Sequence, residues 1–181
     1  MLTTLLIQLA RDAISEAIDK TALIDKSKLV EQYPELQKKS ASFVTLTING
    51  QLRGCIGSLT PHRALFDDIV SNAHAAAFKD PRFLPLSKDE FSDVKIEVSL
   101  LSEPEQFHYK NLKELKDKVT YEHGVVLQHG SHQATFLPQV WEELPSFELF
   151  FSHLCLKAGM DETCLEQHPK IYLYTVEKFK E

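Results

Sequence analysis

Cysteine is scarce in this chain of 181 residues, which contains only three, at Cys55, Cys155 and Cys164. They form no C-x-x-C pair, so the commonest spacing of metal-binding and redox-active cysteines is missing. An odd, sparse cysteine count without a signal peptide predicts reduced thiols. We therefore expect a cytoplasmic protein in which Cys155, in a helix, and Cys164, in a loop, are structural.

Metal and nucleotide motifs are also missing. The eight histidines include no H-x-x-x-H or H-E-x-x-H pair, and no cysteine lies at metal-ligand spacing from them. Neither G-x-x-x-x-G-K-[ST] nor G-x-G-x-x-G occurs. We therefore predict no metal and no cofactor.

Positive charge is not in excess. The net charge is −6, and all of it comes from residues 91–181, which hold 9 basic and 15 acidic side chains. Because binding to a phosphate backbone needs clustered cations, a nucleic-acid partner is the least favoured interpretation, although a small nucleotide or one local anion site is compatible. The apolar N-terminus is interrupted at Arg11 and Asp12, so it is too short to cross a bilayer.

The residue patterns predict an α+β fold. An amphipathic helix begins the chain, two β-rich runs flank the turn signal Asn49-Gly50, and a helix is expected over residues 61–79, capped by Thr60. Further strands are predicted over 93–102, 124–130, 132–138 and 170–179, and further helices over 111–118 and 146–159. Because hairpins dominate over β-α-β units, we expect a mainly antiparallel sheet flanked by helices.

The segment LRGCIG, at residues 52–57, places a thiol between two of only six glycines. Alternation along a strand groups Arg53, Cys55 and Gly57 on one face and Leu52, Gly54 and Ile56 on the other. An even hairpin loop would bury Arg53 among aliphatic residues, whereas an odd loop with Gly50 in a bulge turn would bury Leu52 and Ile56. Hydrophobic matching favours the odd loop, which places Arg53 and Cys55 beside Thr45 and Thr47.

Two interpretations of Cys55 follow. On one strand face the Arg53 guanidinium lies roughly 6–7 Å from the thiol, and a nearby cation favours the thiolate. Gly54 then admits close packing, while Gly57 clears room beside the sulfur. Alternatively, Cys55 is a buried structural residue and the glycines serve packing alone.

Several segments resemble the AMMECR domain family, called AmmeMemoRadiSam system protein A in prokaryotes. They are LRGCIG (52–57), NAHAAAFKDPRFLPL (72–86), IEVSLLS (96–102), TFLPQVWEE (135–143) and LCLKAGM (154–160). The resemblance covers about residues 6–179 and implies one AMMECR domain over residues 1–181, with a main lobe, a smaller lobe and a cleft lined by LRGCIG. It also implies that the protein occurs together with a Memo-like protein and a radical S-adenosylmethionine protein.

The same family pattern includes DPRF, at residues 80–83. Asp80 can accept hydrogen bonds from the turning backbone, and the fork of Arg82 suits a carboxylate or phosphate, but the two side chains can equally pair with each other. Glu97, on the polar side of a strand, is a candidate general base or an ion-pair partner of an arginine.

These residues favour an enzyme. Cys55 is the candidate catalytic residue, and the candidate substrate-binding residues are Arg53, Gly54, Gly57, Asp80, Arg82 and Glu97. The substrate would be a small anionic or nucleotide-like molecule, handled alongside the Memo-like and radical S-adenosylmethionine proteins. The alternative is a non-catalytic partner or scaffold of the same system, because no complete catalytic constellation can be assigned from the sequence.

Overall fold

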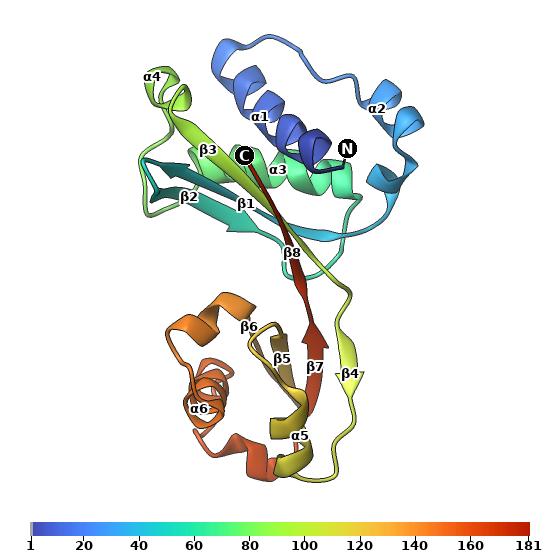
Figure 1. Cartoon of the computed structure of the whole chain (residues 1–181), viewed down its shortest axis with the longest axis vertical. Helices are drawn as coiled ribbons and strands as arrows, with labels where there is room; N and C mark the ends of the chain where they lie inside the picture. Colours follow the sequence, from blue (N-terminus) through green and yellow to red (C-terminus); the bar gives the residue numbers. More distant parts are fainter. Residues whose placement is uncertain (1) are drawn as a thin grey trace. The chain divides into compact units, whose positions relative to one another are not determined.

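A computed structural model describes residues 2–181, with side chains from residue 4 onward. The chain forms two compact units (Figure 1). The first unit comprises Met1–Leu101 and Glu177–Glu181, and the second comprises Ser102–Val176. Each has its own four-stranded sheet and its own hydrophobic core. The predicted α+β class is confirmed, with one sheet in each unit instead of a single sheet; the cleft implied by the family resemblance stays a prediction.

The first unit has a sheet in the order β2-β1-β3-β8, in which β1 is antiparallel to both β2 and β3. Its strands are β1 (Ala41–Ile48), β2 (Gln51–Gly57), β3 (Val94–Leu101) and β8 (Val176–Lys180). Its helices are α1 (Leu2–Asp19), α2 (Lys26–Gln32), α3 (Leu65–Phe78) and α4 (Lys88–Phe91), with a 3-10 turn, η1 (Pro34–Gln37). The helix predicted at the N-terminus and the strand predicted over residues 93–102 are confirmed.

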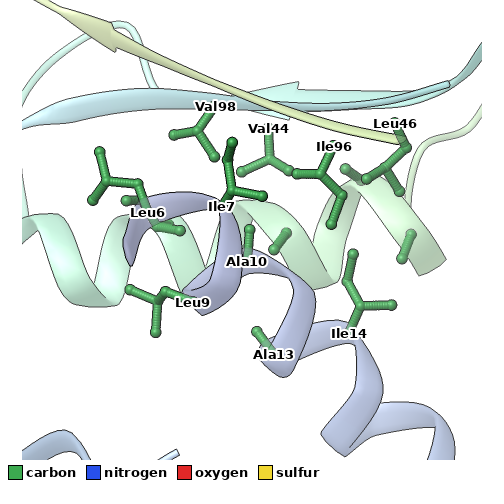
Figure 2. Close-up of a cluster of buried hydrophobic side chains, with 14 of the residues drawn as sticks. Leu6, Ile7, Leu9, Ala10, Ala13, Ile14, Val44, Leu46, Ile96 and Val98 are labelled. Carbon is green, nitrogen blue, oxygen red and sulfur yellow. The ribbon is translucent and has the colours of Figure 1, made fainter. Parts of the chain in front are cut away.

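The core of the first unit lies between one face of the sheet and helices α1 and α3. Figure 2 shows the apolar face of α1, including Leu6, Ala10 and Ile14, against Val44 and Ile96 of the strands. These residues are at most 1% exposed. Because strand side chains alternate, filling this face with aliphatic groups leaves the intervening, more polar residues on the opposite face.

The second unit has a sheet in the order β4-β7-β5-β6. Its strands are β4 (Glu105–Phe107), β5 (Gly124–His129), β6 (His132–Phe136) and β7 (Lys170–Tyr174). Its helices are α5 (Leu112–Lys118) and α6 (Phe147–Lys157), with 3-10 turns η2 (Pro138–Glu142) and η3 (Cys164–Gln167). Aromatic packing dominates the core, where Trp141 stacks on Phe150 with ring centroids 3.7 Å apart.

The strand predicted over residues 170–179 is two strands in two sheets. β7 pairs with β4 and β5, whereas β8 lies beside β3 in the first unit's sheet. Thr175 separates them, and its backbone N–H donates to Ser102 Oγ over 2.8 Å while Ser102 N–H donates to the Thr175 carbonyl over 2.9 Å. The alternating pattern runs through both strands, so it gives no sign of the change of sheet.

Two other predictions are corrected. Helix α3 begins at Leu65 rather than residue 61, because the preceding chain is held extended: Ser40 N–H donates to the Arg63 carbonyl, and Leu65 N–H donates to the Lys38 carbonyl. Cys155 and Cys164 form a disulfide that joins α6 to η3, so the prediction of reduced thiols is wrong for this pair. Both half-cystines are fully buried, which agrees with a structural role.

Candidate functional site

The hairpin that carries Cys55 combines a tight turn with a bulge. Asn49 and Gly50 both have positive φ angles, of 53° and 76°, and Ile48 pairs with Gln51, so the loop has two residues. The predicted odd loop is therefore wrong. The register instead shifts along β2, and Cys55 still lies opposite Thr45.

Because of this bulge, the two ends of β2 differ in how far their apolar side chains are buried. Ile56 pairs with Val44 and packs against the core, as predicted. Leu52 lies before the shift and is 43% exposed, which contradicts the prediction that it would be buried. One extra residue thus lets Ile56 pack against the core while Leu52 is exposed.

Cys55 is a half-buried free thiol on the sheet face opposite the helices. Its Sγ lies 3.1 Å from Oγ1 of Thr45, which can donate a hydrogen bond to a thiolate or accept one from a thiol. Thr45 pairs with Cys55 on one side and with Glu97 on the other, so these residues form a row across β2, β1 and β3. Two cross-strand steps place the Cα atoms of Cys55 and Glu97 about 10 Å apart.

Asp80 and Arg82 hold the backbone of Cys55 at the open edge of β2. Asp80 Oδ2 accepts from the Cys55 N–H over 2.9 Å, and Arg82 Nη2 donates to the Cys55 carbonyl over 3.3 Å. The two side chains also pair with each other, through contacts of 3.0 and 2.7 Å. Together they satisfy both edge groups of Cys55 as a neighbouring strand would.

The electrostatics of this pair are asymmetric. The Asp80 side chain is 2% exposed, and the hydrogen bond from Arg82 is the main reason that the pKa of its carboxyl lies well below the usual range. The Arg82 side chain is 53% exposed, so a second anion can still reach its guanidinium. The interpretation in which Asp80 and Arg82 pair with each other is confirmed, and Arg82 is also brought to Cys55.

Arg53 is not free on the face that carries the thiol. Its Nε and Nη2 donate to the Glu90 carboxylate over 2.9 and 3.0 Å, and Nη2 also donates to the Leu84 carbonyl. Hydrogen bonds, first of all from Arg53, lower the pKa of Glu90 to about 2. The guanidinium carbons of Arg53 and Arg82 lie 5.7 and 5.6 Å from the ring centre of Phe83, so both arginines converge on this ring.

Glu97 is engaged by lysines. Its carboxylate lies 3.0 Å from Lys180 Nζ and 3.9 Å from Lys178 Nζ, and it accepts weakly from Ser99 Oγ. The ion-pair interpretation is therefore the one observed, with lysines in place of an arginine. Within residues 4–181, no histidine or carboxylate lies at hydrogen-bonding distance from Cys55 Sγ.

The two glycines of LRGCIG make two different close contacts. A Cβ on Gly54 would lie 2.1 Å from the Ala76 carbonyl oxygen of α3, so this glycine lets β2 approach the helix as predicted. A Cβ on Gly57 would lie 2.2 Å from the ring of Phe43. The prediction that Gly57 clears room beside the sulfur is wrong, because the Phe43 ring occupies that space.

A buried polar network near the end of β2 was missed. Asp68 and Ser42 are 0% exposed and Asn72 is 2% exposed. Asp68 accepts from Ser42, Arg63 and Ser58, with Arg63 Nε at 2.7 Å. The available signal was the pair Asp68 and Asn72, which lie four residues apart and interrupt the apolar face of α3.

The described part of the chain shows two further absences. No helix in it has both the length and the apolar composition needed to cross a bilayer. No group of three or more His, Cys, Asp or Glu side chains gathers there as a metal site would require.

A comparison with known families gives the AMMECR1 pattern over residues 7–179, which includes every site residue named above. The chain belongs to the AMMECR1 family. One relative, a protein from Methanosarcina mazei, is 38% identical over 155 residues, covering 84% of this chain and 77% of the relative. Another, from Methanocaldococcus jannaschii, is 34% identical over 173 residues, covering 92% and 86%.

A solved structure has the same fold. The crystal structure of uncharacterized protein PH0010 from Pyrococcus horikoshii is similar to this chain with a TM-score of 0.80 and 34% identity. The similarity covers 98% of this chain and 90% of that one. The resemblance drawn from the five sequence segments is therefore confirmed for the fold and the family.

Proposed function

We propose that this AMMECR1 protein acts on a small anionic or nucleotide-like substrate through Cys55. The observation that carries the proposal is a half-exposed free thiol 3.1 Å from the Thr45 hydroxyl, on a backbone held by the Asp80–Arg82 pair. The backbone contacts pre-position the sulfur, and the hydroxyl can stabilise its thiolate form by donating a hydrogen bond. Cys55 thereby serves as a nucleophile or as a direct substrate contact.

The charged groups around Phe83 support the substrate class. Arg82 is cationic at any physiological pH, its hydrogen bond to Asp80 raises its pKa further, and its side chain is 53% exposed. Phe83 is half-buried and offers an aromatic ring next to this guanidinium. A cation beside a ring suits a ligand with both a negative group and a planar base. In this proposal Gly54 and Gly57 support the site through close packing, and Arg53 supports it through its ion pair with Glu90.

The proposal includes a cellular setting. The family resemblance supports action alongside a Memo-like protein and a radical S-adenosylmethionine protein, and we place this action in the cytoplasm.

Competing alkylation rates test the site. Iodoacetate is anionic and iodoacetamide is neutral, so the ratio of their rates measures how strongly the site attracts an anion. We expect this ratio to be severalfold higher for Cys55 than for a free model thiol. Arg82→Gln should lower the ratio, and Arg82→Lys should largely restore it. Mass spectrometry identifies the modified residue, and Cys55→Ser is the blank.

The proposal fails if Cys55 is unreactive in the native protein, or if its iodoacetate preference equals that of the model thiol. Asp80→Asn is a useful companion variant, because it removes the negative charge beside Arg82 while keeping an acceptor for the Cys55 N–H. Its rate ratio should rise above that of the wild type.

A non-catalytic role has one specific observation in its favour. Across the described residues, Cys55 Sγ has a hydroxyl partner but no general base within hydrogen-bonding reach. If the protein is a scaffold, purified Memo-like and radical S-adenosylmethionine proteins should bind it in size-exclusion chromatography, and Cys55→Ser should bind equally well. Absence of a complex at micromolar concentrations would exclude this alternative.

A further inference from the structure

An apolar groove lies within the second unit, far along the sequence from Cys55. It has a volume of about 490 Å³ and lies among α5, the start of α6 and η3. Its apolar lining consists of Leu112, Phe147, Phe151 and Leu165. The volume falls within the range of ligand sites, about 300–1,000 Å³.

The apolar lining of the groove extends from a buried core residue of the second unit to exposed residues on its surface. Phe151 is 1% exposed, and its ring centroid lies 4.5 Å from that of Phe147, which is only partly buried. Leu112 is 43% exposed at the first position of α5. Leu112 and the rings of Phe147 and Phe151 line the same groove, so an apolar group that covers it would gain free energy.

The charges around the groove define what can cover it. Lys113 is paired with Asp117 at 2.7 Å, and Lys116 is paired with Glu148 at 2.5 Å. Glu162 and Glu166 also line the groove, and in residues 4–181 neither has an ion-pair partner. The unneutralised charge at this groove is therefore negative.

The whole second unit has the same bias. Residues 102–176 contain 11 acidic and 6 basic side chains, so their net charge of −5 accounts for most of the chain's net charge of −6. Such a field attracts cationic partners and repels nucleic acids and anionic lipid headgroups. An occupant of the groove must combine apolar side chains with positive charge.

We propose that this groove docks an amphipathic helix of a partner protein, whose apolar side chains are flanked by lysine or arginine. The apolar side chains would cover Leu112 and Phe147, and the cations would pair with Glu162 and Glu166. This is the helix-in-groove mode, in which apolar anchors spaced three and four residues apart enter a hydrophobic surface. The inference does not depend on the chemistry of Cys55.

The test uses a synthetic fluorescein-labelled peptide with leucines on one helical face and lysines on the other. Fluorescence anisotropy should detect its binding to the full chain. Leu112→Asp should weaken binding at least about tenfold. The charge reversal Glu162→Lys with Glu166→Lys should weaken it to a similar degree, and a peptide with glutamate in place of lysine should bind at least about tenfold more weakly.

Matched variants control for unfolding and for general electrostatics. Leu156→Asp changes a leucine that is 54% exposed on α6 and does not line the groove. Glu142→Lys with Glu143→Lys makes the same charge change at exposed positions outside the groove lining. Both should bind the lysine peptide as the wild type does, and thermal melts verify that every variant is folded.

Three results would overturn the proposal. One is no binding of the lysine peptide to the wild type, and another is equal weakening by Leu112→Asp and Leu156→Asp. The third is self-association of the wild type that Leu112→Asp abolishes, because it would assign the groove to a second copy of this chain.

Discussion

At the scale of single residues, charged groups near Cys55 act on its backbone more than on its sulfur. Asp80 and Arg82 bind its N–H and its carbonyl, while the sulfur contacts a neutral hydroxyl. Arg53 forms an ion pair with Glu90. The position of the thiol is therefore set by hydrogen bonds to its backbone at the edge of β2. The proposed function makes its reactivity depend on Thr45 and on the exposed guanidinium of Arg82.

The glycines of LRGCIG are separable by mutation. Gly54→Ala and Gly57→Ala should each lower the free energy of unfolding by about 1–3 kcal/mol, because the added methyl group enters occupied space. Chemical denaturation with urea measures both losses.

The partner of each methyl group distinguishes the two sites. The clash at Gly54 is with backbone, and the clash at Gly57 is with the Phe43 ring. In a Phe43→Ala background, Gly57→Ala should therefore cost much less than in the wild type, while the cost of Gly54→Ala should not change. Equal costs of Gly57→Ala in the two backgrounds would contradict this assignment.

The pair of Glu90 and Arg53 should make stability depend on acidity. Because the pKa of Glu90 is lowered from 4.5 to about 2 on folding, the pair stabilises the protein fully above about pH 4.5. This stabilisation is lost as the pH falls towards 2. Glu90→Gln should lower the urea midpoint at pH 7, and the difference from the wild type should shrink across that window. Asp89→Asn, at the neighbouring exposed position, should show no comparable shrinkage.

At the scale of secondary-structure elements, the hairpin and α3 form one assembly around LRGCIG. β2 touches α3 through Gly54, and the loop after α3 returns to bind Cys55 through Asp80 and Arg82. At the end of β2, the buried Asp68 of α3 joins Ser42 to Ser58. Helix α3 and the loop after it therefore hold β2 at Gly54, at Cys55 and just beyond its end.

Asp68 should be a major determinant of stability. Asp68→Ala leaves Arg63 and the buried Ser42 and Asn72 without their shared acceptor, so we expect a loss of about 3–5 kcal/mol in the free energy of unfolding. The neighbouring Asp67 pairs with Lys26 at the surface. Asp67→Ala should cost at most about 1 kcal/mol in the same urea titration. Similar losses for the two variants would refute the importance of the network.

Local signals predicted much of this assembly. Asn49-Gly50 predicted the hairpin, and the apolar spacing of the N-terminal segment predicted α1, because turn geometry and helical periodicity are encoded within a few residues. Hydrophobic matching also grouped Cys55 with Thr45, although the odd loop on which that grouping rested is wrong. The bulge in β2 was not predictable, because one extra residue is invisible to a pattern of period two.

Tertiary partners escaped prediction for a different reason. The contacts of Asp80 with Cys55 and of Arg53 with Glu90 join residues 25 and 37 positions apart. Residue types limit such contacts to opposite charges or to donors and acceptors, but they do not select the partner. The family resemblance grouped Arg53, Cys55 and Asp80 but not Glu90, and the structure supplies the pairing.

At the scale of the whole molecule, the second unit is an insertion in the sequence of the first. The chain leaves the first sheet after β3 and returns to it in β8, the strand beside β3. The segments entering and leaving the second unit are hydrogen-bonded to each other at Ser102 and Thr175. Two separate cores make it meaningful to measure the stability of each unit.

The disulfide should stabilise the second unit selectively. Cys155→Ala with Cys164→Ala removes a link across 9 residues, which should cost about 2–3 kcal/mol by loop entropy. Hydrogen exchange should accelerate in β5 and β7, while exchange in β1 and β3 keeps its wild-type rate. Equal acceleration in both sets of strands would show that the two cores unfold together.

The insertion also sets an order of events during synthesis. A ribosome completes the second unit, residues 102–176, before it adds β8, although β8 belongs to the first sheet. Until then the first unit lacks Phe179, a member of its core, and the two lysines that neutralise Glu97. The nascent chain thus carries an open sheet edge at β3 through the translation of 75 further residues. The first unit is therefore the first to begin synthesis and the last to complete its sheet.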